Sequence, residues 1–147
     1  MKKLSYTLLF VLAATISVSA QIYKPVKWQT SVEKVAEGEY DLIITAVIEP
    51  KWHLYAQNVP EDGPVPTTFY FEEGDGLSLV RETTEDEGKT VDDPVFGMRI
   101  KYFEDLAVFK QRVKADAGSS IVAEVEFMVC DDTKCLPPTY ADLTFNL

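Results

Sequence analysis

The chain has 147 residues and carries 24 acidic against 14 basic side chains, which gives a formal net charge of −10. This acidic balance argues against nucleic acids and anionic membranes as partners, because both would be repelled electrostatically. The length corresponds to one domain, with enough chain to bury a core without disulfide staples.

The first twenty residues have the pattern of a secretory signal peptide. Lys2 and Lys3 precede an apolar run from Leu4 to Val18, and Val18-Ser19-Ala20 offers the small residues of a cleavage site. The apolar run is shorter than the roughly 20 residues needed to cross a bilayer, so an uncleaved anchor is the lesser alternative. We expect cleavage after Ala20 and a periplasmic domain of residues 21–147 without stable membrane insertion.

Beyond the signal, apolar and polar residues alternate, turn residues recur at short intervals, and no stretch has a helical period. In Glu39 to Ile48 both faces carry apolar residues, which indicates a strand in the middle of a sheet. Eight strands in one domain are typical of a sandwich, so the sequence predicts an all-β, antiparallel β-sandwich. The predicted strands are Val26–Val35, Glu39–Ile48, Trp52–Gln57, Thr67–Glu72, Leu77–Glu82, Arg99–Phe109, Ile121–Val129 and Tyr140–Asn146.

The segments between these strands are rich in glycine, proline and acidic residues, and we expect them to be turns and loops. The acidic stretch Glu85 to Asp93 is one of them, and Asp92 and Asp93 are expected to be solvated there. The sequence has no phosphate-binding glycine loop and no serine, histidine and aspartate arrangement that spacing supports.

The two cysteines after the signal, Cys130 and Cys135, are separated by four residues between two predicted strands. A turn of this length brings two α-carbons within disulfide range, and an exported protein meets an oxidising compartment. A ring this short contributes only about 2 kcal/mol as a staple, and a disulfide near a hydrophilic turn is open to attack by an external thiolate. The residues leave open a redox disulfide, a structural turn lock and a metal site.

Local charge distinguishes the two sulfurs. Lys134 precedes Cys135 and favours a thiolate there, whereas Asp131 and Asp132 follow Cys130 and disfavour one. Met128, His53 and the two cysteines could alternatively form a soft copper(I) site, provided that the strand runs on regularly to Cys130.

The segment Cys130-Asp-Asp-Thr-Lys-Cys135-Leu-Pro-Pro138 resembles the cysteine loop of the amino-terminal periplasmic domain of the thiol:disulfide interchange protein DsbD. Three further segments agree with that family in order: Lys51 to Tyr55, Gly63 to Thr67, and Asp93 to Gly97 followed by Tyr102-Phe103. The resemblance implies an immunoglobulin-like β-sandwich and thiol:disulfide interchange of the protein-disulfide reductase type.

The same resemblance implies roles for individual residues. Cys130 and Cys135 would be the redox pair, with Cys135 facing the partner. Tyr55 and His53 would lie on the neighbouring strand, and the loop around Phe96 would be a cap over the disulfide, with Val95 the competing candidate for its tip. We expect His53 to be a packed or hydrogen-bonded histidine rather than a catalytic one. Without the resemblance, Phe96 would be interpreted as an ordinary aromatic residue at the end of the sandwich.

The resemblance also implies partners. Electrons would come from a membrane thiol carrier and pass to periplasmic thioredoxin-like proteins, with no organic cofactor and no metal, and we expect a monomer. Because the sequence ends at Leu147 without a membrane domain, we expect the carrier to be a separate protein. The alternative function is a noncatalytic immunoglobulin-like interaction module whose turn is locked by a structural disulfide.

Overall fold

The computed structural model describes residues 23–72, 74 and 76–147, and these residues contain strands and no helix. The predicted signal peptide, residues 1–20, lies outside the described residues. The strands are β1 Val26–Ala36, β2 Glu39–Ile48, β3 His53–Tyr55, β4 Thr68–Phe71, β5 Leu77–Leu79, β6 Thr84–Glu85, β7 Lys89–Asp93, β8 Met98–Phe103, β9 Leu106–Ala115, β10 Ser120–Phe127, β11 Val129–Cys130 and β12 Thr139–Asn146.

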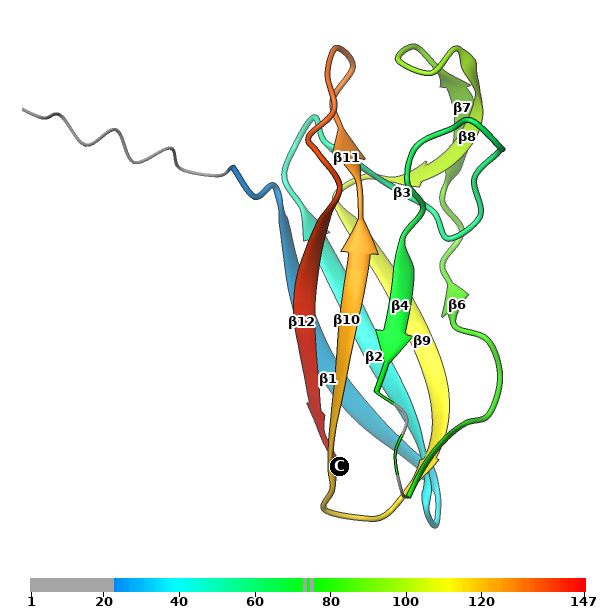
Figure 1. Cartoon of the computed structure of the whole chain (residues 1–147), viewed down its shortest axis with the longest axis vertical. Coiled ribbons are helices and arrows are strands. Elements are labelled where there is room, and N and C mark those ends of the chain that lie inside the picture. Colours follow the sequence, from blue (N-terminus) through cyan, green and yellow to red (C-terminus); the bar gives the residue numbers. More distant parts are fainter. Residues whose placement is uncertain (1–22, 73, 75) are drawn as a thin grey trace, which may run out of the picture.

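Two antiparallel sheets form the body of the molecule (Figure 1). One has the order β1-β2-β9-β5, with β6 also paired to β9, and the other has the order β12-β10-β4. Every second residue of the central strands is buried between the sheets, as in β2 and β10. The prediction of an all-β, antiparallel sandwich is confirmed, and so is the placement of Glu39–Ile48 inside a sheet.

The core between the sheets is aliphatic with an aromatic centre. The Trp28 ring lies against Phe69, Phe109 and Phe127, with ring centroids 5.2–6.2 Å apart. These rings come from both sheets, so they hold the two layers together, and such pairs contribute beyond their buried area. Neither cysteine belongs to this main core.

A third sheet, of order β11-β3-β8-β7, extends the sandwich at one end (Figure 1). Its two faces differ. Leu54, Phe103 and Val129 point into the main core, whereas Tyr55, Ile100 and Cys130 belong to a second, smaller apolar cluster on the opposite face. This alternation follows from the two-residue period of a strand.

Two predictions for this region are wrong. The expected strand Arg99–Phe109 is two strands, because the chain turns at Glu104-Asp105, where Asp105 has φ 60° and its carbonyl accepts the N–H of Ile48 at 2.8 Å. The expected loop Glu85–Asp93 begins at the last residue of β6 and contains the whole of β7 instead. β7 is an edge strand held by backbone pairing to β8, so its acidic sequence lacks the apolar alternation that a sequence pattern detects.

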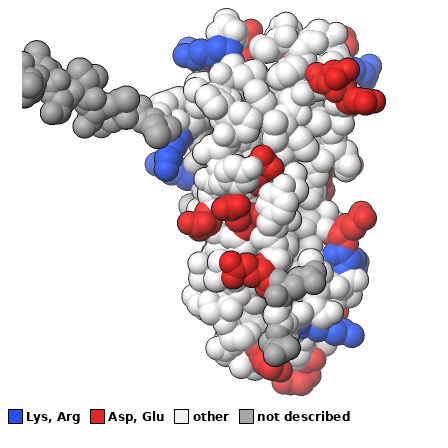
Figure 2. Space-filling view, in the orientation of Figure 1, with Lys and Arg blue, Asp and Glu red and all other residues white. Residues whose placement is uncertain are grey.

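Acidic side chains are scattered along the face in Figure 2 rather than collected into one patch. This distribution fits a solvated surface, and charge alone marks no binding site on this face.

The separation of the cysteines from the main core generates a prediction about stability. The Cys130→Ser/Cys135→Ser double variant should retain a cooperative thermal unfolding transition and lose only about 2 kcal/mol, because the disulfide closes a short ring. Circular dichroism melting with denaturant titration measures this. Failure of the double variant to fold would favour a structural turn lock.

Candidate functional site: a capped disulfide at one end of the sandwich

Cys130 and Cys135 are joined in a disulfide within a short β-hairpin, with their α-carbons 4.0 Å apart. Two backbone hydrogen bonds flank the pair: Leu136 donates to the Val129 carbonyl and Asp131 donates to the Lys134 carbonyl, both at 2.9 Å. The cysteines therefore occupy a non-hydrogen-bonded position of the hairpin, where opposing residues approach most closely. Regular pairing of the backbone thus brings the two sulfurs together.

The turn between the cysteines is organised by Asp131. Its Oδ1 accepts the backbone N–H groups of Thr133 at 2.8 Å and Lys134 at 2.9 Å, and also the Thr133 hydroxyl at 2.8 Å. These hydrogen bonds, that of the Thr133 hydroxyl foremost, lower the pKa of Asp131. The carboxylate therefore stays ionised and holds the turn closed.

The two sulfurs differ in burial. Cys130 is 0% exposed, whereas Cys135 at the far end of the turn is partly exposed. β11 pairs with β3, so Cys130 is covered by strand neighbours as well as by the second apolar cluster. Cys130 is therefore the more buried of the two cysteines.

Tyr55 forms the floor of this second cluster, which also contains Ile100 and Cys130. The Tyr55 side chain is fully buried, and its hydroxyl donates to Oδ2 of Asp93 at 2.8 Å. Burial, together with this hydrogen bond, raises the pKa of Tyr55, so the phenol stays neutral. The partly buried side chains packed around the cluster are Val59, Phe96, Met98, Tyr102, Met128 and Cys135.

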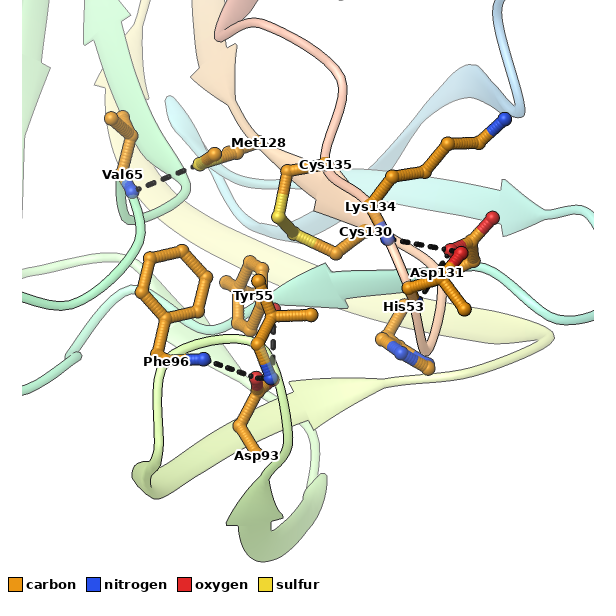
Figure 3. The surroundings of a disulfide bond; sticks show 12 residues. His53, Tyr55, Val65, Asp93, Phe96, Met128, Cys130, Asp131, Lys134 and Cys135 are labelled. Carbon is orange, nitrogen blue, oxygen red and sulfur yellow. Dashed lines mark hydrogen bonds between the residues drawn. A yellow bond between two sulfur atoms is a disulfide. The ribbon is translucent and has the colours of Figure 1, made fainter.

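The turn from β7 to β8 lies over this floor (Figure 3). Oδ1 of Asp93 accepts the backbone N–H groups of Val95 at 2.8 Å and Phe96 at 3.1 Å, and Gly97 closes the turn with φ 64°. The Phe96 ring meets the Tyr55 ring edge to face at 5.8 Å, whereas Val95 is 39% exposed. Phe96 therefore packs against the cluster that contains the disulfide, whereas Val95 is exposed.

Asp93 is the residue that the sequence interpretation missed. It was expected in a solvated loop, but it is 2% exposed and its carboxylate joins the turn to Tyr55. The signal was present in Asp93-Pro-Val-Phe-Gly97, because an aspartate at the start of a turn that ends in glycine commonly bonds the backbone ahead of it.

His53 lies on β3 directly opposite Cys130. It is 5% exposed and stacks on Tyr102 with the ring centroids 4.4 Å apart, which confirms the expectation of a packed histidine. Figure 3 shows His53 and Phe96 on opposite sides of Tyr55.

The copper alternative required a regular strand up to Cys130. The strand is interrupted at Met128, between β10 and β11, and the Met128 sulfur instead accepts the Val65 N–H at 3.4 Å. Among the described residues, no three or more His, Cys, Asp and Glu side chains gather as a metal site would require.

None of the described residues forms a helix that is long and apolar enough to span a membrane.

The comparisons with known proteins agree on one family. A sequence model of the family "Thiol:disulfide interchange protein DsbD, N-terminal" matches residues 19–146. No curated protein matches the sequence at a significant level.

Two solved structures share the fold. The reduced N-terminal domain of DsbD from Neisseria meningitidis is 14% identical with a TM-score of 0.56, and the match covers 85% of this chain and 94% of that one. The N-terminal periplasmic domain of ScsB from Proteus mirabilis is 17% identical with a TM-score of 0.56, over 83% of this chain and 44% of that one. The likeness confirms the predicted immunoglobulin-like β-sandwich. With the family match extending over most of its length, this chain belongs to the family of DsbD N-terminal domains.

Proposed function

We propose that this protein exchanges disulfides with other proteins through the Cys130/Cys135 pair. The observation that carries the proposal is the asymmetric, capped disulfide: one sulfur is fully buried, the other is partly exposed in a hydrophilic turn, and an aromatic side chain packs against their cluster. Exchange requires that one sulfur be open to an external thiolate while the second stays close enough to resolve the mixed disulfide.

The proposed cycle uses the two sulfurs in order. In the reduced protein, the Cys135 thiolate attacks an oxidised partner and forms a mixed disulfide with it. Cys130 then attacks Cys135 and releases the partner as a dithiol, which leaves this protein oxidised. Lys134 supports the first step, because positive charge beside Cys135 favours its thiolate.

For partners and location, we propose export across the inner membrane with cleavage after Ala20, and action in the periplasm as a monomer. Electrons would come from a membrane thiol carrier and pass to thioredoxin-like proteins. The family match and the signal-like sequence of residues 1–20 support this assignment. No organic cofactor or metal is needed, because the sulfurs carry the electrons themselves.

The cap generates a prediction about access. Replacing Phe96 by alanine should speed alkylation of the reduced protein by a small reagent several-fold, because the ring packs on the cluster beside the sulfurs. Val95→Ala is the matched control on the same turn, and it should react like the wild type because Val95 is exposed. A large loss of stability with unchanged labelling would instead make Phe96 an ordinary core residue.

Asp93 should control the position of the cap. Asp93→Ala removes the acceptor of the Tyr55 hydroxyl and of two N–H groups of the turn, so it should speed alkylation as Phe96→Ala does. It should also cost about 1–3 kcal/mol, because the buried Tyr55 hydroxyl loses its partner. Asp92→Ala removes the same charge from the exposed neighbouring position and should change neither quantity. Equal behaviour of the two variants would contradict this role for Asp93.

The roles of the sulfurs are tested by trapping. Cys130→Ser should accumulate a covalent complex with a thioredoxin-like partner, visible on a non-reducing gel and lost on reduction, because the resolving sulfur is gone. Cys135→Ser should give no complex. Trapping by Cys135→Ser alone would exchange the two roles, and trapping by neither would count against disulfide exchange itself.

A further inference from the structure

The strand pairing places a histidine opposite the buried cysteine. His53 and Cys130 are directly opposite in the antiparallel pairing of β3 with β11. Opposite residues project from the same face of a sheet, with β-carbons about 4.5–5.5 Å apart. Since Cys130 is also opposite Cys135 in the hairpin, the three residues form a row across one face.

The imidazole of His53 is buried, and one of its ring nitrogens lacks a hydrogen-bond partner among the described residues. Nδ1 has no hydrogen-bond partner among the described residues, which is an uncommon state for a buried polar atom. Two carboxylates lie just beyond hydrogen-bond distance, with Oε1 of Glu104 3.9 Å from Nδ1 and Oδ1 of Asp132 3.6 Å from Nε2. When the imidazole accepts a proton both ring nitrogens become donors, and a carboxylate oxygen lies near each of them.

Two further side chains near the His53 ring are Tyr102 and Lys89. Tyr102 on β8 stacks against the imidazole, and burial, followed by the nearby Glu104, raises the pKa of Tyr102, so it stays a neutral phenol. Lys89 on β7 pairs with Glu104 and neutralises part of its charge. The groups around His53 are therefore the Tyr102 ring and two carboxylates, one of them paired with Lys89, and Cys130 lies opposite His53 on the neighbouring strand.

Cys130 needs a proton acceptor if it resolves mixed disulfides. The nucleophile in exchange is a thiolate, and burial in apolar surroundings disfavours that form. Cys130 is fully buried in the second cluster, so bulk water is not placed to take its proton. A base at the opposite strand position, which His53 occupies, could accept this proton.

We propose that neutral His53 accepts the proton of the Cys130 thiol during resolution. This inference rests on the proposed function. The proton moves from the Cys130 sulfur to the imidazole, and the resulting thiolate attacks the Cys135 sulfur. The Cys130–Cys135 bond forms as the bond between Cys135 and the partner sulfur breaks, and that sulfur leaves as a thiolate with the electron pair. The dithiol loses two electrons and the partner disulfide gains them, while Asp132 and Glu104 stabilise the imidazolium.

The test follows the two steps separately in the full chain. Reduced protein is mixed with an aromatic disulfide, 5,5′-dithiobis(2-nitrobenzoate), in a stopped-flow instrument. Attack by Cys135 releases the first coloured thiolate, and resolution by Cys130 releases the second. His53→Gln keeps a polar side chain of similar reach but accepts no proton, and Tyr102→Phe is the matched control, since it keeps the stacked ring and removes the neighbouring phenol.

The expected result is specific to the second release. At pH 7, His53→Gln should slow it about a hundredfold, at the low end of what general-base catalysis contributes, with little change in the first release. The difference should shrink only as the pH rises past about 8.5, the ordinary pKa of a thiol, because burial disfavours the Cys130 thiolate. Tyr102→Phe should resolve like the wild type. Thermal melts of all variants accompany the kinetics.

Several outcomes would overturn the inference. An unchanged second release in His53→Gln, or a slowing that is equal at every pH, would reduce His53 to a packing residue while leaving the exchange function intact. If His53→Gln does not fold, the pH dependence of the wild type decides. The rate of its second release should level off well below pH 8.5, and a rate that still rises up to that pH would contradict the role of His53 as a base. If the wild type gives no second release at all, the proposed exchange function itself fails.

Discussion

The pairing of β11 with β3 is the constraint on which the candidate site depends. In this register Val129 faces Leu54 and Cys130 faces His53. The first pair lies on the main-core side and the second on the side of the smaller cluster, because side chains alternate across a strand. A slip by one residue would turn Cys130 into the main core, out of reach of any partner. The sandwich core thus fixes the register, and the register fixes where the sulfur points.

The site is assembled from hairpin tips held by polar side chains. Asp131 closes the cysteine turn and Asp93 closes the cap turn, each by accepting backbone N–H groups. Asp93 has the additional bond to the buried Tyr55 hydroxyl, which connects the cap to the floor of the cluster.

Much of the architecture could be predicted because it follows from patterns within short segments of the sequence. The alternation of Glu39–Ile48, the four-residue spacing of the cysteines and the turn residues each reflect nearest-neighbour geometry. Predictions failed where backbone pairing or a contact with a distant residue, rather than an apolar pattern in the sequence, sets the local structure. The edge strand β7 has no apolar alternation, since it is held by backbone pairing to β8. The turn at Asp105 divides the segment Arg99–Phe109, which the sequence pattern predicts as one strand. Asp93 was misplaced for a related reason: its burial depends on Tyr55, a residue 38 positions away.

The sequence by itself determined that the chain is an all-β sandwich with a cysteine hairpin, because strand period, turn chemistry and cysteine spacing are properties of short segments. Only the tertiary structure decided that Phe96 rather than Val95 packs on the cluster, that Asp93 anchors the cap, and that His53 stands opposite Cys130. Each of these depends on contacts between strands far apart in the chain, whose register is set by packing of the whole core.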